Sequence, residues 1–534
     1  MSQMNIAFVN LSLLIYLAFM LITSRKYLHM LQLNSYMNSR FLKWFLINYK
    51  KDIKPIGVLL VVPLLFLWWK NLLIFSITWI CVNFIFLYNY QKTKASEKKK
   101  FVITNRIKRL YVTIASLLIL SLLIVNLVYF SDKDSWGLVI FISVIILVEE
   151  INIFLTLIAN ILNYPLENVI NRFYVIDAKR FLNQHDQLIV IGITGSYGKT
   201  SSKFILSRIF SEKYNVLMTP ESYNTLMGVV RTVRELLKPT HEIFVVEMGA
   251  KKKGDIRKIC QLVKPKYGLL TSIGPQHLDT FKSFENIIET KFELVDSLPE
   301  NGVAFLNFNN DAIRKRKTEK RIISYGIEND KLNYWAENIY YDSSGLSFSL
   351  YTYKNEKMVI KTRLLGLHNV LNILGACSMA LEMGMKVNDI CYAVKQLSPI
   401  PHRLELKSQS TGVTIIDDAF NSNPEGANEA LNVLNKFNHS TKILITPGLV
   451  ELGEREYECN YSLGVKAASV CDYIVLVGNK RSKPMMDALI ENNFDNQKVF
   501  VVKNLNEAME KLKSITILDS VILFENDLPD NYEE

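Results

Sequence analysis

Long apolar runs are concentrated in the first third of this chain, and shorter ones recur through the rest. Each long run approaches the ~20 residues that an α-helix needs to cross the apolar core of a bilayer. The pattern therefore predicts an α-helical membrane module of five spans over residues 1–162. The predicted spans are residues 5–23, 55–69, 71–89, 110–130 and 137–159.

Beyond the predicted module, short apolar runs alternate with amphipathic segments, which is typical of an α/β fold with parallel sheets. We expect a central domain over residues 163–402 and a smaller, Rossmann-like α/β domain over residues 403–534. Residues 333–362 predict antiparallel strands at the edge of the central domain. Strands of the last domain are expected at 413–416, 442–446, 473–477 and 520–523.

The formal net charge of +11 belongs to the predicted membrane module. Residues 1–180 contain 20 Lys+Arg and 8 Asp+Glu, so the rest of the chain is nearly neutral and no nucleic-acid partner is expected. The basic residues gather in the 24–54 and 90–109 loops, and such loops stay on the cytoplasmic side of a membrane. We therefore expect a multi-pass membrane protein with membrane lipid as a partner and with residues after about 160 in the cytoplasm.

Three local features of the sequence give expectations for individual segments and residues. Residues 29–48 suit an interfacial amphipathic helix, with a connecting loop as the alternative. Glu149 and Glu150 interrupt the fifth run, where carboxylates mark a functional site unless they lie near a helix end or face a partner helix. The six cysteines are scattered without a C-x-x-C pair, so neither a zinc ribbon nor a disulfide framework is expected.

A glycine turn lies between a predicted buried strand at 187–193 and a predicted helix at 201–210. Such a turn aims backbone N–H groups at phosphate, while a lysine reaches the outer phosphates and a threonine hydroxyl holds Mg²⁺. Ile193 stands where the common G-x-x-x-x-G-K-[ST] phosphate loop (P-loop) has its first glycine, so this is the shorter T-G-x-x-G-K-T form. A chance G-K-T tripeptide is the competing interpretation, and the flanking strand and helix argue against it. The predicted ATP-binding residues are Thr194, Gly195, Ser196, Tyr197, Gly198, Lys199, Thr200 and Ser201.

Two further polar side chains are expected at the same edge of the sheet. Glu247 ends an apolar strand that begins near residue 242, and doubly wound sheets bind ligands at the carboxyl ends of their strands. His277 follows another short strand at 268–272. We expect Glu247 to bind a metal ion and His277 to be functional, although a lone loop histidine is more often structural.

Further motifs recur along the chain in a fixed order. They are SYNTLMG at 222–228, EMGA at 247–250, GPQHL at 274–278, TKFE at 290–293, GLHNVLN at 366–372, PHRLE at 401–405, DDAFNSNP at 417–424 and ELGE at 451–454. Together with the phosphate loop, they resemble the Mur ligase family over about residues 164–525, most closely its branch that adds D-alanyl-D-alanine to a UDP-N-acetylmuramoyl tripeptide. The resemblance implies a ligase of bacterial cell-envelope and peptidoglycan synthesis, and the predicted membrane module would attach it to the cell membrane.

The resemblance also implies the roles of individual residues. Lys199 and Asn224 would stabilise the transferring phosphate, Thr200 and Glu247 would hold one Mg²⁺, and His277 would hold a second. Lys291 resembles the family lysine that is carbamylated and helps to order the metal site; an ordinary amphipathic-helix lysine is the alternative. The residues implied to contact adenine, ribose or phosphates are His368, Asn369, Asn372, Arg403, Asp418 and Asn421.

In the implied reaction, a carboxylate attacks the γ-phosphate of ATP, ADP leaves, and an amine displaces phosphate from the acyl phosphate. The implied partners are a muropeptide-like or lipid-linked carboxylate acceptor and an amino acid or dipeptide amine. Both stay open, because the membrane module stands where the family has a UDP-binding domain, and residues 307–310 and 525–530 depart from the family pattern. A membrane ATPase or transporter and an inactive nucleotide-binding regulator are the competing classes of function.

Overall fold

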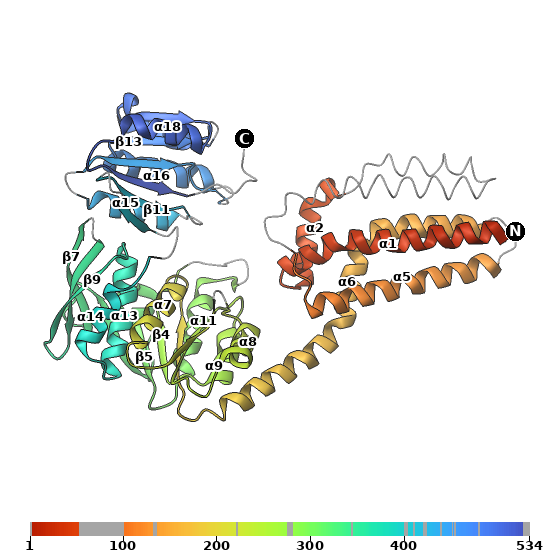
Figure 1. Ribbon diagram of the computed structural model, residues 1–534, viewed down its shortest axis with the longest axis horizontal. Helices are drawn as coiled ribbons and strands as arrows, with labels where there is room; N and C mark the ends of the chain where they lie inside the picture. Colours follow the sequence, from red (N-terminus) through yellow and green to blue (C-terminus); the bar gives the residue numbers. More distant parts are fainter. Residues whose placement is uncertain are drawn as a thin grey trace. The chain divides into compact units, whose positions relative to one another are not determined.

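The structure is a computed structural model, and it forms two compact units, Met1–Phe173 and Tyr174–Glu534 (Figure 1). The first is a helical unit that includes residues 163–173 of the predicted central domain, and the second contains the rest of that domain and the predicted C-terminal domain. The residues that the structure describes are 3–52, 101–131, 136–220, 223–274, 281–342, 345–399, 404–408, 412–419, 424–437, 440–450, 452, 455–478 and 481–526.

The helical unit is built from long helices that contain three of the five predicted spans. Residues 5–23, 110–130 and 137–159 lie in helices, whereas 55–69 and 71–89 lie outside the described residues. By length and composition, one described stretch, Asn152–Leu182, could cross a membrane, so the module of five spans stays a prediction. The described helices of this unit are α1 (Gln3–Leu33), α2 (Asn38–Asp52), α5 (Asn105–Ser131) and α6 (Trp136–Leu182), the last continuing into the second unit.

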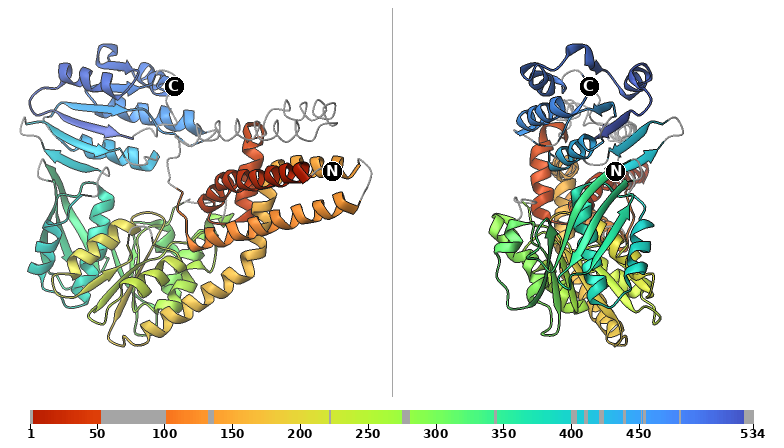
Figure 2. Two further views of the ribbon diagram at one scale, coloured as in Figure 1. Left: turned by 45° about the vertical axis from the view of Figure 1, so that its right-hand side comes forward. Right: turned by 90° about the vertical axis from the view of Figure 1, so that its left-hand side faces the viewer.

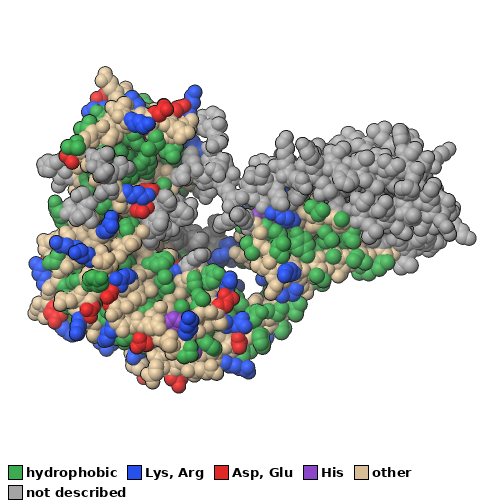
Figure 3. Space-filling view, viewed as in Figure 1, with side chains coloured by type: hydrophobic (Ala, Val, Ile, Leu, Met, Phe, Trp, Pro, Cys, Tyr) green, Lys and Arg blue, Asp and Glu red, His purple; other side chains and the backbone are tan. Residues whose placement is uncertain are grey.

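Within the helical unit, α6 turns polar side chains inward and apolar side chains outward. Its buried polar residues follow helical spacing: Asn152, Thr156, Asn160, Asn163 and Glu167. Its exposed apolar residues alternate with them and continue beyond Glu167: Phe154, Ile158, Ile161, Leu162, Leu166, Val169 and Phe173. Apolar side chains also dominate the described face of this unit in Figure 3. A helix in water normally has the opposite arrangement.

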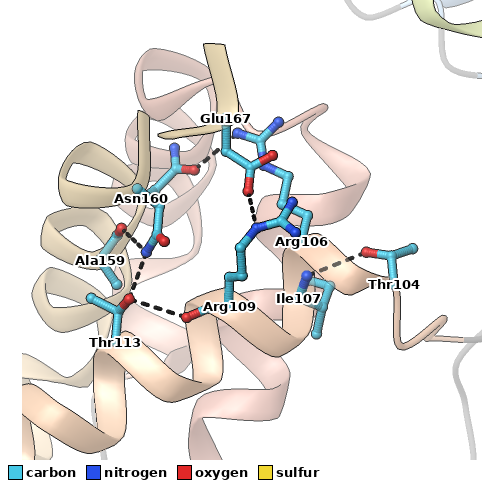
Figure 4. A network of polar contacts seen from close by, with 9 residues as sticks. Thr104, Arg106, Ile107, Arg109, Thr113, Ala159, Asn160 and Glu167 are labelled. Carbon is cyan, nitrogen blue, oxygen red and sulfur yellow. Dashed lines mark hydrogen bonds and ion pairs between the residues drawn. The ribbon is translucent and has the colours of Figure 1, made fainter. Parts of the chain in front are cut away.

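Three side chains of the buried polar face of α6 are hydrogen-bonded to α5 (Figure 4). Glu167 accepts a hydrogen bond from Arg109 Nε of α5 at 2.7 Å, and Asn160 Oδ1 accepts one from Arg106 Nη2 at 3.2 Å. Asn163 Nδ2 donates to Thr113 Oγ1 at 2.7 Å. Since unpaired polar groups are costly to bury, these bonds fix how α5 and α6 pack.

The middle domain is a nine-stranded sheet with the order β2-β3-β1-β4-β5-β6-β7-β8-β9. The strands from β2 to β7 pair in parallel, and β8 and β9 continue the sheet antiparallel. The predicted antiparallel strands at 333–362 are therefore confirmed. The strands are β1 (Ile189–Thr194), β2 (Val216–Met218), β3 (Ile243–Glu247), β4 (Tyr267–Leu270), β5 (Val303–Asn307), β6 (Arg321–Ile327), β7 (Tyr334–Asp342), β8 (Gly345–Thr352) and β9 (Lys357–Thr362).

Helices cover both faces of this sheet, because its central strands are apolar on both sides (Figure 2). Ile191 and Val245 pack toward α7 and α13, whereas Val190 and Phe244 pack toward α8 and α9. The helices are α7 (Lys199–Phe210), α8 (Leu226–Leu236), α9 (Asp255–Val263), α11 (Phe284–Asp296), α12 (Asp311–Lys315), α13 (Leu367–Glu382) and α14 (Val387–Lys395).

The C-terminal domain has a six-stranded sheet with the order β10-β11-β15-β12-β13-β14, parallel except for the β10–β11 pair. Its strands are β10 (Glu405–Ser408), β11 (Thr414–Asp418), β12 (Lys442–Thr446), β13 (Tyr473–Val477), β14 (Val499–Val502) and β15 (Val521–Glu525). Its helices are α15 (Pro424–Asn435), α16 (Glu456–Val470), α17 (Lys483–Glu491), η3 (Asn496–Lys498) and α18 (Leu505–Ile515). All four strands predicted for this domain from apolar runs are present.

Candidate functional site

The glycine turn follows β1 and leads directly into α7, as the sequence predicts. Gly198 has a φ of 79°, and a Cβ at this position would lie 2.6 Å from Asn372 Oδ1, so only glycine fits there. The turn is tied to the segment after β4, because Ser196 N donates to Ser272 O at 2.7 Å and Tyr197 N donates to Ser272 Oγ at 3.1 Å. The loop is thus held at the carboxyl edge of the sheet.

Lys199, the first residue of α7, folds back over this turn. Its Nζ donates to Gly195 O at 2.7 Å and to Ser196 O at 2.8 Å. Burial lowers the pKa of Lys199, and the nearby Glu247 carboxylate opposes that shift. The ammonium is therefore poised at the turn, with carbonyl partners that a phosphate group could replace.

Glu247 lies beside the turn because β3 pairs with β1 in parallel, with Glu247 opposite Ile193. Its Oε1 accepts a hydrogen bond from Asn224 Nδ2 at 3.0 Å. Its Oε2 lies 3.1 Å from Nζ of Lys203, and the side chains of this ion pair are 2% and 0% exposed. The structure thus brings together Glu247 and Asn224, which the sequence predicts, and adds Lys203.

Lys203 was not predicted as a site residue. The sequence feature that could have indicated Lys203 is its position four residues after Lys199. This spacing places the two lysines on neighbouring turns of one helix face. A lysine in an amphipathic helix usually extends to solvent, so this spacing alone does not distinguish a buried residue from an exposed one.

Lys291 lies on α11 and is only 5% exposed. Burial, and after it the nearby Lys199, lower the pKa of Lys291 to about 7, while Glu293 opposes the shift. Glu293 itself accepts hydrogen bonds from the backbone N–H groups of Gly254 and Arg257 at the start of α9. Lys291 is therefore not the solvent-exposed helix lysine that was the alternative interpretation.

A pocket of about 720 Å³ opens beside the turn. Residues of the middle domain and of the C-terminal domain line it together, and Asn307, Glu425 and Glu429 join it without having been predicted. Asn372 Nδ2 is buried and has no hydrogen-bond partner within the described part of the chain, so it can serve a ligand in the pocket. The predicted residues that line it are Ser196, Tyr197, Gly198, Lys199, Thr200, Ser201, Asn224, Glu247, His368, Asn369, Asn372 and Asp418.

The remaining predicted residues do not line the pocket or lie outside the described part of the chain. Thr194 is buried under the turn, where its Oγ1 donates to Met248 O at 2.9 Å, so it supports the loop. Gly195 and Lys291 are not among the described lining residues. His277, Arg403 and Asn421 lie outside the residues that the structure describes.

The residues present fit a magnesium ion carried by a nucleotide. Among the described residues, no three His, Cys, Asp or Glu side chains gather into a metal cluster. Mg²⁺ in phosphoryl-transfer sites is usually held by one or two carboxylates together with substrate phosphates and water. Glu247 and the Thr200 hydroxyl, both lining the pocket, suit that mode.

Two family models match this chain. The Mur ligase middle domain matches residues 193–380, and the Mur ligase glutamate ligase domain matches residues 402–524. These ranges contain the glycine turn and most of the residues that line the pocket.

Individual relatives agree with these matches. The UDP-N-acetylmuramoyl-tripeptide--D-alanyl-D-alanine ligase of Mycobacterium tuberculosis is 30% identical over 305 residues, which cover 55% of this chain and 59% of that protein. The Escherichia coli protein of that name is 28% identical over 334 residues, covering 62% and 73%. A crystal structure of MurF from Acinetobacter baumannii is 25% identical with a TM-score of 0.57, covering 67% of this chain and 77% of that one. The matched part thus spans less than two thirds of the mycobacterial protein.

Proposed function

This chain carries the middle and C-terminal domains of the Mur ligase family, and from that premise we propose that it is an ATP-dependent acid–amine ligase. The proposed reaction joins a carboxylate to an amine through an acyl phosphate and releases ADP and phosphate. The observation that carries the proposal is the pocket in which Lys199, Thr200 and Glu247 meet at adjacent strand ends.

The charged groups of the pocket suit the first step of this reaction. A carboxylate that attacks a triphosphate brings two anions together, so the site must supply positive charge and hydrogen-bond donors. Lys199 and Asn224 Nδ2 supply them from the protein. Thr200 and Glu247 would hold Mg²⁺, with His277 as the proposed ligand of a second ion, and the metal would neutralise further phosphate charge.

Lys291 suits the carbamylation that the family resemblance implies. Only a neutral amine attacks CO₂, and a lysine whose pKa is lowered to about 7 is partly neutral under physiological conditions. The amine nitrogen forms the bond to carbon and loses a proton, which converts a buried cation into an anion. Such an anion beside Lys199 would help to order the metal site.

For the substrates, we propose a muropeptide-like carboxylate acceptor and a D-alanyl-D-alanine-like amine, in a step of peptidoglycan synthesis. The names of the mycobacterial and Escherichia coli relatives support this choice. A lipid-linked acceptor is the second candidate, and the outward apolar face of α6 favours it.

We further propose that the helical unit lies in the cell membrane, with the ligase domains in the cytoplasm. Exposed apolar residues such as Val169 and Phe173, 64% and 62% exposed, would be costly in water and favourable in lipid. Buried amides and an ion pair between helices are how membrane helices satisfy their polar groups.

The proposal is tested by purifying the full chain in detergent and measuring ADP release from Mg-ATP. Release should require both a carboxylate and an amine, and the product mass should equal their sum less one water. UDP-N-acetylmuramoyl tripeptide and its lipid-linked form are compared as acceptors, with D-alanyl-D-alanine as the amine. Turnover with neither substrate present, or turnover that follows a transported solute, would instead indicate an ATPase or transporter.

A further inference from the structure

The Lys203–Glu247 ion pair is unusual because both partners are buried beside a nucleotide pocket. Lys203 belongs to the face of α7 that packs into the core with Leu206, Ile209 and Phe210. An apolar residue would be the less costly choice at such a position, since burying an ammonium group costs several kcal/mol unless it is paired. Packing alone therefore does not explain why a charged residue occupies position 203.

Lys203 lies behind Glu247 and is not itself among the described residues that line the pocket, whereas Glu247 is. The Glu247 carboxylate is held on two sides, by Lys203 at Oε2 and by Asn224 at Oε1, and its backbone N–H donates to Thr219 Oγ1 at 3.1 Å. This arrangement fixes the direction in which the carboxylate faces the phosphate loop.

The charge balance explains why a cation is needed behind the carboxylate. An isolated carboxylate with 2% exposure would be strongly destabilised, and it would repel an incoming triphosphate. With Lys203 beside it, the carboxylate is paired with a cation and adds little net negative charge to the pocket. A divalent ion that arrives with a nucleotide then finds an oriented oxygen ligand.

From this geometry we infer that Lys203 is a positioning residue that acts through Glu247 to set how strongly Mg²⁺ increases nucleotide affinity. The inference rests on the proposed function, because it takes Glu247 as the magnesium ligand. Lys203 itself touches neither the nucleotide nor the reacting atoms.

The test measures the ADP dissociation constant of the full chain in detergent, with Mg²⁺ and with EDTA, by titration calorimetry. The ratio of the two constants is the magnesium increment. Lys203→Met should lower this increment by about tenfold and leave magnesium-free ADP binding within twofold, because loss of one partner frees the buried carboxylate to reorient. Lys203→Arg, which keeps the charge, should restore most of the increment.

Two controls separate positioning from a general structural effect. Arg208→Met removes a partly buried ion pair between Arg208 of the same helix and Glu212, which follows the helix, and should not change the increment. In a Glu247→Gln background, Lys203→Met should have no further effect, since a residue that acts through Glu247 has nothing left to position. Should Lys203→Met fail to fold, Lys203→Gln is used, because it keeps a hydrogen-bond donor without the charge.

An unchanged magnesium increment in a folded, ADP-binding Lys203→Met or Lys203→Gln variant would overturn the inference. So would an equal loss of ADP affinity with and without Mg²⁺, which would indicate damage to the loop. If the unaltered chain shows no magnesium increment at all, the proposed function fails first, and the two failures are thereby distinguished.

Discussion

Helices α6 and α7 both bury polar side chains, but they use them in opposite ways. On α6, Asn160, Asn163 and Glu167 are bonded to residues of neighbouring helices. On α7, Lys199 bonds to carbonyls of its own turn, and Lys203 pairs with Glu247, which lines the pocket. Buried polar groups on α6 therefore hold helices together, whereas the two buried lysines of α7 serve the candidate nucleotide pocket.

This difference separates stability from activity. Substitutions in the polar face of α6 should weaken the helical unit and spare nucleotide chemistry, whereas substitution of Lys199 on α7 should impair nucleotide chemistry without lowering stability. The first two predictions below test that division, and a variant of either kind that lowers both properties together would contradict it.

The largest effect is expected for Lys199→Ala. Turnover should fall by at least about 1,000-fold, because the ammonium that stabilises the transferring phosphate is lost. The free energy of unfolding should stay the same or rise slightly, since a buried charge is removed. Steady-state ADP release and chemical denaturation measure the two quantities, with the exposed Lys213→Ala as control.

A smaller effect, on stability alone, is expected for Glu167→Ala. Loss of this carboxylate leaves Arg109 of α5 without its ion-pair partner and should destabilise the helical unit by about 2 kcal/mol. Denaturant titration in detergent measures the change. The control is Asp177→Ala, which removes a half-exposed pair with Arg234 and should cost less than about 0.5 kcal/mol. ADP release by both variants should stay within twofold of the unaltered chain.

The effect expected for Lys291→Met is confined to part of the pH range. The pKa of Lys291 is lowered from 10.5 to about 7 on folding, so the unfolded chain binds more protons between these values and stability rises with pH there. Removing the lysine should therefore stabilise the protein below pH 7, and this gain should vanish as the pH approaches 10.5. Denaturation in CO₂-free buffer without nucleotide measures it, and a gain independent of pH would contradict the assignment.

The sequence predicts the α/β part well because its signals are local. Apolar runs locate the strands. The glycine turn is recognisable as a short motif because its backbone requires glycine: Gly198 has a positive φ and lies close to Asn372. The parallel pairing of β1 with β3 then places Glu247 at the turn, as expected from a doubly wound sheet.

The side chains whose roles the sequence does not reveal are those that contact residues distant along the chain. Lys203 resembles any surface lysine of an amphipathic helix until β3 brings Glu247 against it. Likewise, Asn160 and Glu167 lie in a mostly apolar stretch, and only the packing of α5 against α6 shows that they face inward. Asn307 stands where the family pattern has acidic residues, yet it lines the pocket and donates to Thr271 O at 2.7 Å.

The inward fold of Lys199 has a consequence for which molecules the loop admits. Its ammonium already donates hydrogen bonds to two acceptors, Gly195 O and Ser196 O. A ligand that takes their place must therefore form stronger interactions with the ammonium than these two carbonyls do. A lone inorganic phosphate brings few oxygens and must leave its own hydration shell, whereas a polyphosphate chain engages the lysine and the helix N-terminus at once. We therefore expect the loop to bind the phosphate chain of a nucleotide more tightly than a single inorganic phosphate.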